Sequence, residues 1–147
     1  MSTDNKTYSH FDLSDEVFVQ KFVDCTLNPA LFSHEAHLRL AWIHVTRYGL
    51  RKAIENIRAQ IATYDRGLGD GTKYHETITV AAICVVHHFT LKSTAATFKQ
   101  FIAEFPQLRS HFRELLTQHY SFDIARDPGA KREYVRPDIL PFDQDHK

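Results

Sequence analysis

The sequence predicts an all-α protein, a helical bundle of about five to six helices with an irregular C-terminal tail packed on it. Apolar residues recur at helical spacing through most of the chain, and no stretch shows the period-two alternation of a strand. Serine, glycine and proline residues divide the chain at helix-like intervals. Its 147 residues suffice for one hydrophobic core. We therefore expect a single helical domain over 13–142, a disordered or extended N-terminus over 1–12 and a frayed C-terminus over 143–147.

Clear start and stop signals bound the first three expected helices. The first begins after Ser14, a good N-cap residue, and ends before Pro29. The second spans 33–48, and Gly49 follows it as a natural terminator. The third spans 50–64 and has the most regular amphipathic pattern of the chain. Because the link between them is so short, the second and third helices should be antiparallel neighbours.

A glycine-rich loop opens the second half of the chain. Three glycines lie within 67–71, and the helix expected over 72–90 is apolar nearly all round, so it should be the most buried. A fifth helix is expected over 93–104 and a sixth over 106–119. Over 121–142, repeated prolines rule out a long helix, and apolar residues among them indicate a tail that folds back over the bundle.

Charge, cysteine use and hydropathy narrow the functional classes. Lys+Arg and Asp+Glu number 18 each, so the formal net charge is zero and we expect no nucleic-acid partner. Cys25 and Cys84 lie in apolar stretches without metal-type spacing and are interpreted as reduced core residues. The longest apolar run, 78–86, is too short for a bilayer, and the N-terminus lacks a signal pattern. These features predict a cytoplasmic protein that does not bind membranes.

The placement of the histidines, of which the chain has 10, is its most informative feature. On a helical wheel, His34 points with the apolar stripe of the second helix and His37 lies at the edge of that face. His75 shares the apolar face of the fourth helix, and His119 falls on the apolar stripe of the sixth. Imidazole is the commonest protein ligand for zinc and suits other transition metals. We therefore predict a divalent metal ion (Zn, Fe or Ni) held by His34, His37 and His75.

Three functional hypotheses follow from this constellation. In the first, the protein is a small metal-dependent enzyme, a hydrolase or an oxygenase, in which Glu76 and His119 transfer protons and Tyr74 contacts the bound cofactor. In the second, the same histidines form a polar patch in an apolar pocket that binds a small organic or anionic ligand without catalysis. In the third, they are hydrogen-bonded core residues of a structural protein, and an exposed apolar face mediates homodimer formation.

Several segments also resemble a known family. The stretches FSHEAHLRLAW (32–42) and KYHETIT (73–79) resemble the hallmark segments of a family of uncharacterised, all-helical bacterial proteins. The segments HYS (119–121) and YVRPD (134–138) are similar to its C-terminal part, so the resemblance covers 32–142. It implies no activity. It does imply motif positions at His34, His37, Tyr74, His75 and His119.

Overall fold

The computed structural model describes residues 9–69, 71 and 73–143, and this part of the chain contains helices and no strand. The all-α prediction is confirmed. Two short 3₁₀ turns, His10–Asp12 and Pro29–Leu31, accompany the α-helices. The helices are α1 (Asp15–Val23), α2 (His34–Tyr48), α3 (Leu50–Leu68), α4 (Glu76–Thr90), α5 (Phe98–Glu104), α6 (Gln107–Ser110), α7 (Phe112–Thr117) and α8 (Pro128–Arg132).

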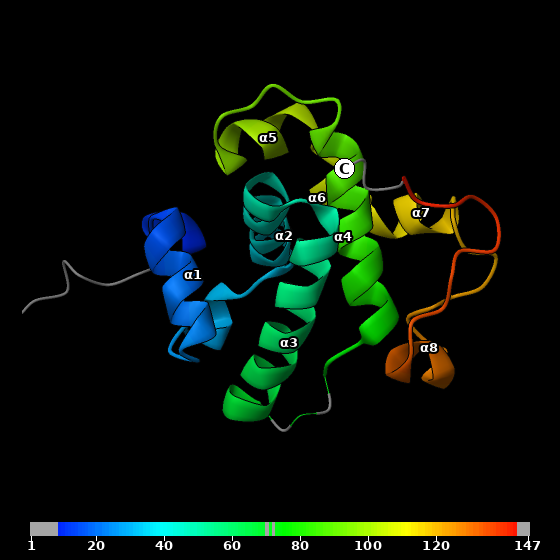
Figure 1. Cartoon of the computed structure of the whole chain (residues 1–147), viewed down its shortest axis with the longest axis horizontal. Helices are drawn as coiled ribbons and strands as arrows, with labels where there is room; N and C mark the ends of the chain where they lie inside the picture. Colours follow the sequence, from blue (N-terminus) through cyan, green and yellow to red (C-terminus); the bar gives the residue numbers. More distant parts are fainter. Residues whose placement is uncertain (1–8, 70, 72, 144–147) are drawn as a thin grey trace, which may run out of the picture.

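Two helices, α2 and α4, form the centre of the bundle (Figure 1). The third long helix, α3, packs on both of them; α5 and α6 contact α2, while α7 and α8 lie on the far side of α4. Every residue of α2 from 38 to 45 is buried, so its burial extends round its whole circumference. Although α4 was expected to be the most buried helix, it shares this position with α2, because each is covered by neighbours on several sides.

The boundaries of α2 follow the signals read from the sequence. The Ser33 hydroxyl accepts a hydrogen bond from the Ala36 amide at 3.2 Å and so caps the helix. Gly49 ends it with a φ of 84°, a left-handed value that costs a glycine little. The short link places α3 directly beside α2, as predicted.

Later boundaries differ from the expected ones. Helix α4 begins at Glu76 with His75 as its N-cap, and Thr72, where the helix was expected to start, lies outside the described residues. The helix expected over 93–104 is confined to Phe98–Glu104 and capped by Thr97. The single helix expected over 106–119 is two short ones, because the backbone at His111 leaves helical geometry with φ −135° and ψ 37°.

The N-terminus and the tail both pack on the bundle. Residues 9–12 were expected to be disordered or extended, but they form a capped 3₁₀ turn in which His10 is only 3% exposed. The tail folds back as predicted: the Tyr120 hydroxyl donates to the Val135 carbonyl at 2.7 Å, and the Ile139 amide donates to the His119 carbonyl at 2.9 Å. None of the described helices combines the length and the hydropathy needed to cross a bilayer.

Candidate functional site

Two of the three predicted metal ligands lie at the surface end of α2. His34 was expected to point into the core, but it and His37 are both exposed, because the first turn of α2 extends beyond the core. His34 Nε2 donates to the Leu108 carbonyl at 3.0 Å, since a carbonyl can only accept. His37 Nδ1 donates to the Ser33 carbonyl at 2.9 Å, and its ring stacks on Phe32 with a centroid distance of 3.8 Å. Each ring is therefore fixed by its own carbonyl partner.

The third predicted ligand, His75, has both ring nitrogens in hydrogen bonds. Its Nδ1 accepts from the Ile78 amide at 3.1 Å and thereby caps α4. Its Nε2 donates to the Ile124 carbonyl at 2.8 Å, which ties the start of α4 to the segment before α8. With Nε2 protonated and the Nδ1 lone pair occupied, this imidazole has no nitrogen left for a metal ion in this arrangement.

The predicted proton-transfer residues also have structural partners. Glu76 is buried, and its carboxylate accepts from the Tyr74 hydroxyl at 2.5 Å and from Arg58 Nε at 2.6 Å. Burial and the neighbouring carboxylate raise the pKa of Tyr74, so its proton stays on the phenol. His119 Nδ1 donates to the Leu140 carbonyl at 2.7 Å and so holds the tail. These contacts connect α3 to α4 and the tail to the bundle.

The structure thus separates most of the predicted site residues. Among residues 9–69, 71 and 73–143, no three His, Cys, Asp or Glu side chains are grouped so that they could hold a metal ion. His37 and Tyr74 do come together, in the lining of a cavity of about 220 Å³. Glu76 and His119 line two other cavities, and His34 lines the largest one. The residues predicted as one site therefore occupy different parts of the surface.

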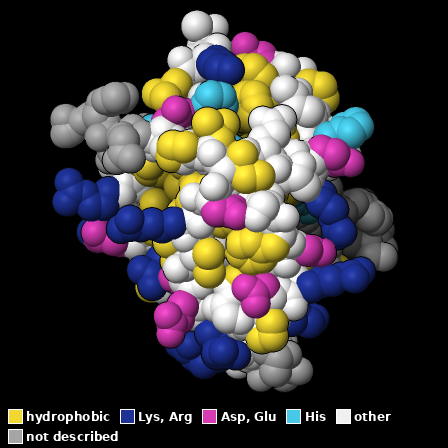
Figure 2. All heavy atoms as spheres, turned by 90° about the vertical axis from the view of Figure 1, so that its right-hand side faces the viewer, with side chains coloured by type: hydrophobic (Ala, Val, Ile, Leu, Met, Phe, Trp, Pro, Cys, Tyr) yellow, Lys and Arg dark blue, Asp and Glu magenta, His cyan; other side chains and the backbone are white. Residues whose placement is uncertain are grey.

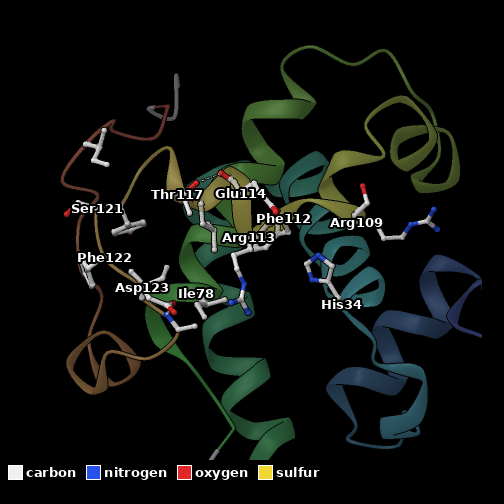
Figure 3. Close-up of a pocket in the computed structure, with 16 residues that line it drawn as sticks. His34, Ile78, Arg109, Phe112, Arg113, Glu114, Thr117, Ser121, Phe122 and Asp123 are labelled. Atoms are coloured by element: carbon white, nitrogen blue, oxygen red, sulfur yellow. Dashed lines mark hydrogen bonds between the residues drawn. The ribbon is translucent and has the colours of Figure 1, made fainter.

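The largest cavity, about 880 Å³, is the candidate site (Figure 3). It lies between α6 and α7 on one side and the segment 121–125 on the other, and His34 and Ile78 bring α2 and α4 into its wall. Hydroxyl groups and charged side chains interrupt a largely apolar lining. Its larger apolar lining residues are Ile78, Phe112, Leu116, Tyr120, Phe122, Ile124 and Ile139.

The apolar surface beside this cavity is left open to solvent. Phe122 and Ile139, which line it, are 38% and 57% exposed. Figure 2 shows the side of the molecule that carries α7, α8 and the tail, with apolar side chains along its middle and most Lys and Arg toward its edges. An exposed apolar surface of this kind is typical of a binding site.

Two charged side chains of the cavity, Arg113 and Glu114, make no ion pair with any described residue. Arg109 is paired with Glu35 at 3.0 Å, and Asp123 with Arg126 at 3.6 Å. The Arg113 side chain makes no ion pair and no hydrogen bond with any described residue. It extends from α7 into the space between Ile78 and His34 (Figure 3). The guanidinium is therefore available to a ligand.

A buried network behind the cavity fixes Arg109, and sequence reasoning missed it. Glu35 accepts from His10 Nε2 at 2.9 Å on one oxygen and from Arg109 on the other. Arg39 Nη1 lies 3.3 Å from His10 Nδ1, and because a guanidinium only donates, Nδ1 must carry the lone pair. Burial is the main cause that lowers the pKa of His10, and Arg39 adds to it. A neutral His10 thus links the N-terminal turn to the rim of the cavity.

One signal in the sequence, the spacing of two arginines, could have indicated part of this cavity. Arg109 and Arg113 are four residues apart, a spacing that would place them on one face of a continuous helix. The break at His111 redirects α7, so the two guanidinium groups meet different surroundings. Spacing alone does not reveal that one is paired and the other is not.

The chain was compared with protein-family models, curated proteins and solved structures, and none of them matches it. Fold and site together define an all-α protein with an amphipathic surface cavity. The resemblance to a bacterial family stays a prediction.

Proposed function

We propose that this protein binds a small organic molecule in the cavity lined by His34 and Arg113. The observation that carries the proposal is the cavity itself: about 880 Å³ of space whose walls combine apolar side chains with hydroxyl and charged ones. Ligand pockets in proteins have this size. The unpaired Arg113 guanidinium and the fixed His34 ring supply the directional contacts that would orient a ligand.

Binding without catalysis is favoured because the groups proposed for chemistry lie elsewhere. His75, Glu76 and His119 do not line this cavity, and all three have partners of their own. Within the cavity, the His34 ring donates from Nε2 to a backbone carbonyl, and its Nδ1 bonds to no described residue. A metal-dependent reaction at the three predicted ligands remains the alternative hypothesis, and it requires His75 to release at least one of its hydrogen bonds.

An NMR screen tests the proposal. A library of neutral, anionic and cationic fragments is titrated into ¹⁵N-labelled protein, and we expect shift changes grouped around residues of the cavity. The variant Thr117→Trp should abolish these changes, because a large ring at this exposed cavity position fills the space. Thr63→Trp is the matched control, since Thr63 is also an exposed helical threonine whose hydroxyl bonds a carbonyl of its own helix.

Two results would contradict the proposal. One is that no fragment produces shift changes around the cavity. The other is that fragments bind but Thr117→Trp and Thr63→Trp reduce binding equally, which would place the site outside this cavity.

A further inference from the structure

The charges in the cavity indicate which class of ligand it takes. Arg109 and Asp123 already have partners of opposite charge, so neither attracts a ligand strongly. Arg113 has none among the described residues, and it projects between the apolar residue Ile78 and the ring of His34 (Figure 3). Arg113 is exposed, and its charge-assisted hydrogen bonds to an anion are stronger than those between neutral groups. Its planar fork matches the two oxygens of a carboxylate.

The cavity also has one carboxylate without an ion pair, at Glu114. Glu114 follows Arg113 directly, and successive residues of a helix point about 100° apart, so the two side chains leave α7 in different directions. Arg113 is the one that reaches into the space between the walls (Figure 3). The cavity therefore combines a positive group within it, apolar walls, and a ring nitrogen of His34 that bonds to no described residue.

We infer that the ligand is an amphipathic organic anion whose carboxylate pairs with Arg113 and whose apolar body packs on Phe112, Leu116 and Ile124. This inference rests on the proposed binding function and adds the ligand class. The Nδ1 atom of His34 bonds to no described residue, so it offers the ligand one further polar contact.

Three probes with one apolar body test the inference: 4-phenylbutyrate, 4-phenylbutanamide and 4-phenylbutylamine. Each is titrated into the full chain, with Kd taken from the NMR shifts of cavity residues. We expect the anion to bind about tenfold more tightly than the amide, the size of effect expected for charge-assisted hydrogen bonds, and the amine to bind most weakly. Added salt should reduce the advantage of the anion.

Matched variants of neighbouring residues locate the interaction. Arg113→Gln should remove the preference for the anion over the amide, and Arg113→Lys should keep part of it because it keeps the charge but not the fork. Glu114→Gln should leave the affinity for the anion unchanged or raise it. Both positions of substitution are exposed helical sites, and unchanged NMR spectra away from the cavity would show that each of the three variants is folded.

The results of these titrations distinguish a failure of the inferred ligand class from a failure of the proposed binding function. The inference is overturned if the amide or the amine binds as tightly as the anion, or if Glu114→Gln weakens binding more than Arg113→Gln does. It is also overturned if none of the three probes binds while other fragments occupy the cavity, a result that leaves the binding function intact. If nothing binds in the cavity, the binding function itself fails.

Discussion

The N-terminal network around Arg39 and the cavity wall that carries Arg113 both lie near the N-terminal end of α2. They differ in how many hydrogen-bond partners their charged groups have. In the N-terminal network, formed by His10, Asp15, Glu35 and Arg39, the Arg39 guanidinium is buried and donates to two carbonyls, a carboxylate and His10 Nδ1. In the cavity wall, Arg113 is exposed and donates to no described residue. The comparison teaches that a charge with several fixed partners holds the fold, whereas an unpaired charge beside a cavity is free to act on a ligand.

The largest expected effect is a loss of stability when Arg39 is replaced, compared with the same replacement of Arg113. Arg39→Met should lower the free energy of unfolding by about 3–5 kcal/mol, because it leaves Asp15 and the His10 and Leu13 carbonyls without their buried donor. Arg113→Met, the matched control, should change it by less than about 0.5 kcal/mol. Urea unfolding followed by circular dichroism measures both. Equal losses in the two variants would mean that the distinction between the two groups is wrong.

The pH dependence of the free energy of unfolding extends the comparison to a third group. This group is the ring of His44, which is buried and has no acidic partner among the described residues. Burial lowers the pKa of His44 from 6.5 to about 4, and Arg47 adds to the effect. Within the described part of the chain, the buried Nε2 of this ring has no hydrogen-bond partner. The stabilising contribution of the neutral ring is complete above pH 6.5 and is lost as the pH falls toward 4.

The size of this effect is measured against a variant that cannot titrate. Between pH 6.5 and 4, the wild type should lose about 3 kcal/mol of stability relative to His44→Leu. Denaturant unfolding at a series of pH values provides the two curves. If the curves of wild type and variant run parallel over this range, the ring of His44 is not held in its neutral form.

An intermediate effect is expected at the Arg58–Glu76–Tyr74 contact. Glu76→Gln keeps the shape of the side chain but removes the charge that both donors use, so stability should fall by about 2 kcal/mol. Glu133→Gln is the control, because Glu133 lines the same cavity as Glu76 but is exposed. Thermal unfolding of both variants at pH 7 makes the comparison. If Glu133→Gln loses as much stability as Glu76→Gln, the structural role given to Glu76 is contradicted.

The smallest expected effect is that of added zinc. Because both ring nitrogens of His75 are already bonded, Zn²⁺ should leave the Tm of protein purified without a histidine tag unchanged. Differential scanning fluorimetry with and without the ion measures this. A rise in Tm that is lost in His75→Gln would instead support the metal-dependent hypothesis.

The candidate site was only partly accessible to sequence reasoning. His34 was identified as a site residue, but the expectation that it points into the core was wrong, since the first turn of α2 extends past the residues that cover the rest of the helix. His10 was not identified, because a single 3₁₀ turn has no periodicity from which burial can be inferred. Arg113 was missed because its lack of a partner depends on the break at His111 and on the position of the segment 121–125.

The sequence by itself determined the helical class, the ends of α2 at Ser33 and Gly49, and the return of the tail onto the bundle. These features depend on caps, left-handed glycine and apolar spacing, which act within a few residues of the chain. Only the tertiary structure decided that His75 bonds to Ile124 and that Arg113, beside a cavity, pairs with none of the residues at 9–69, 71 and 73–143. Burial and pairing of a polar group depend on elements far apart in sequence, and local patterns carry no information about which of them will meet.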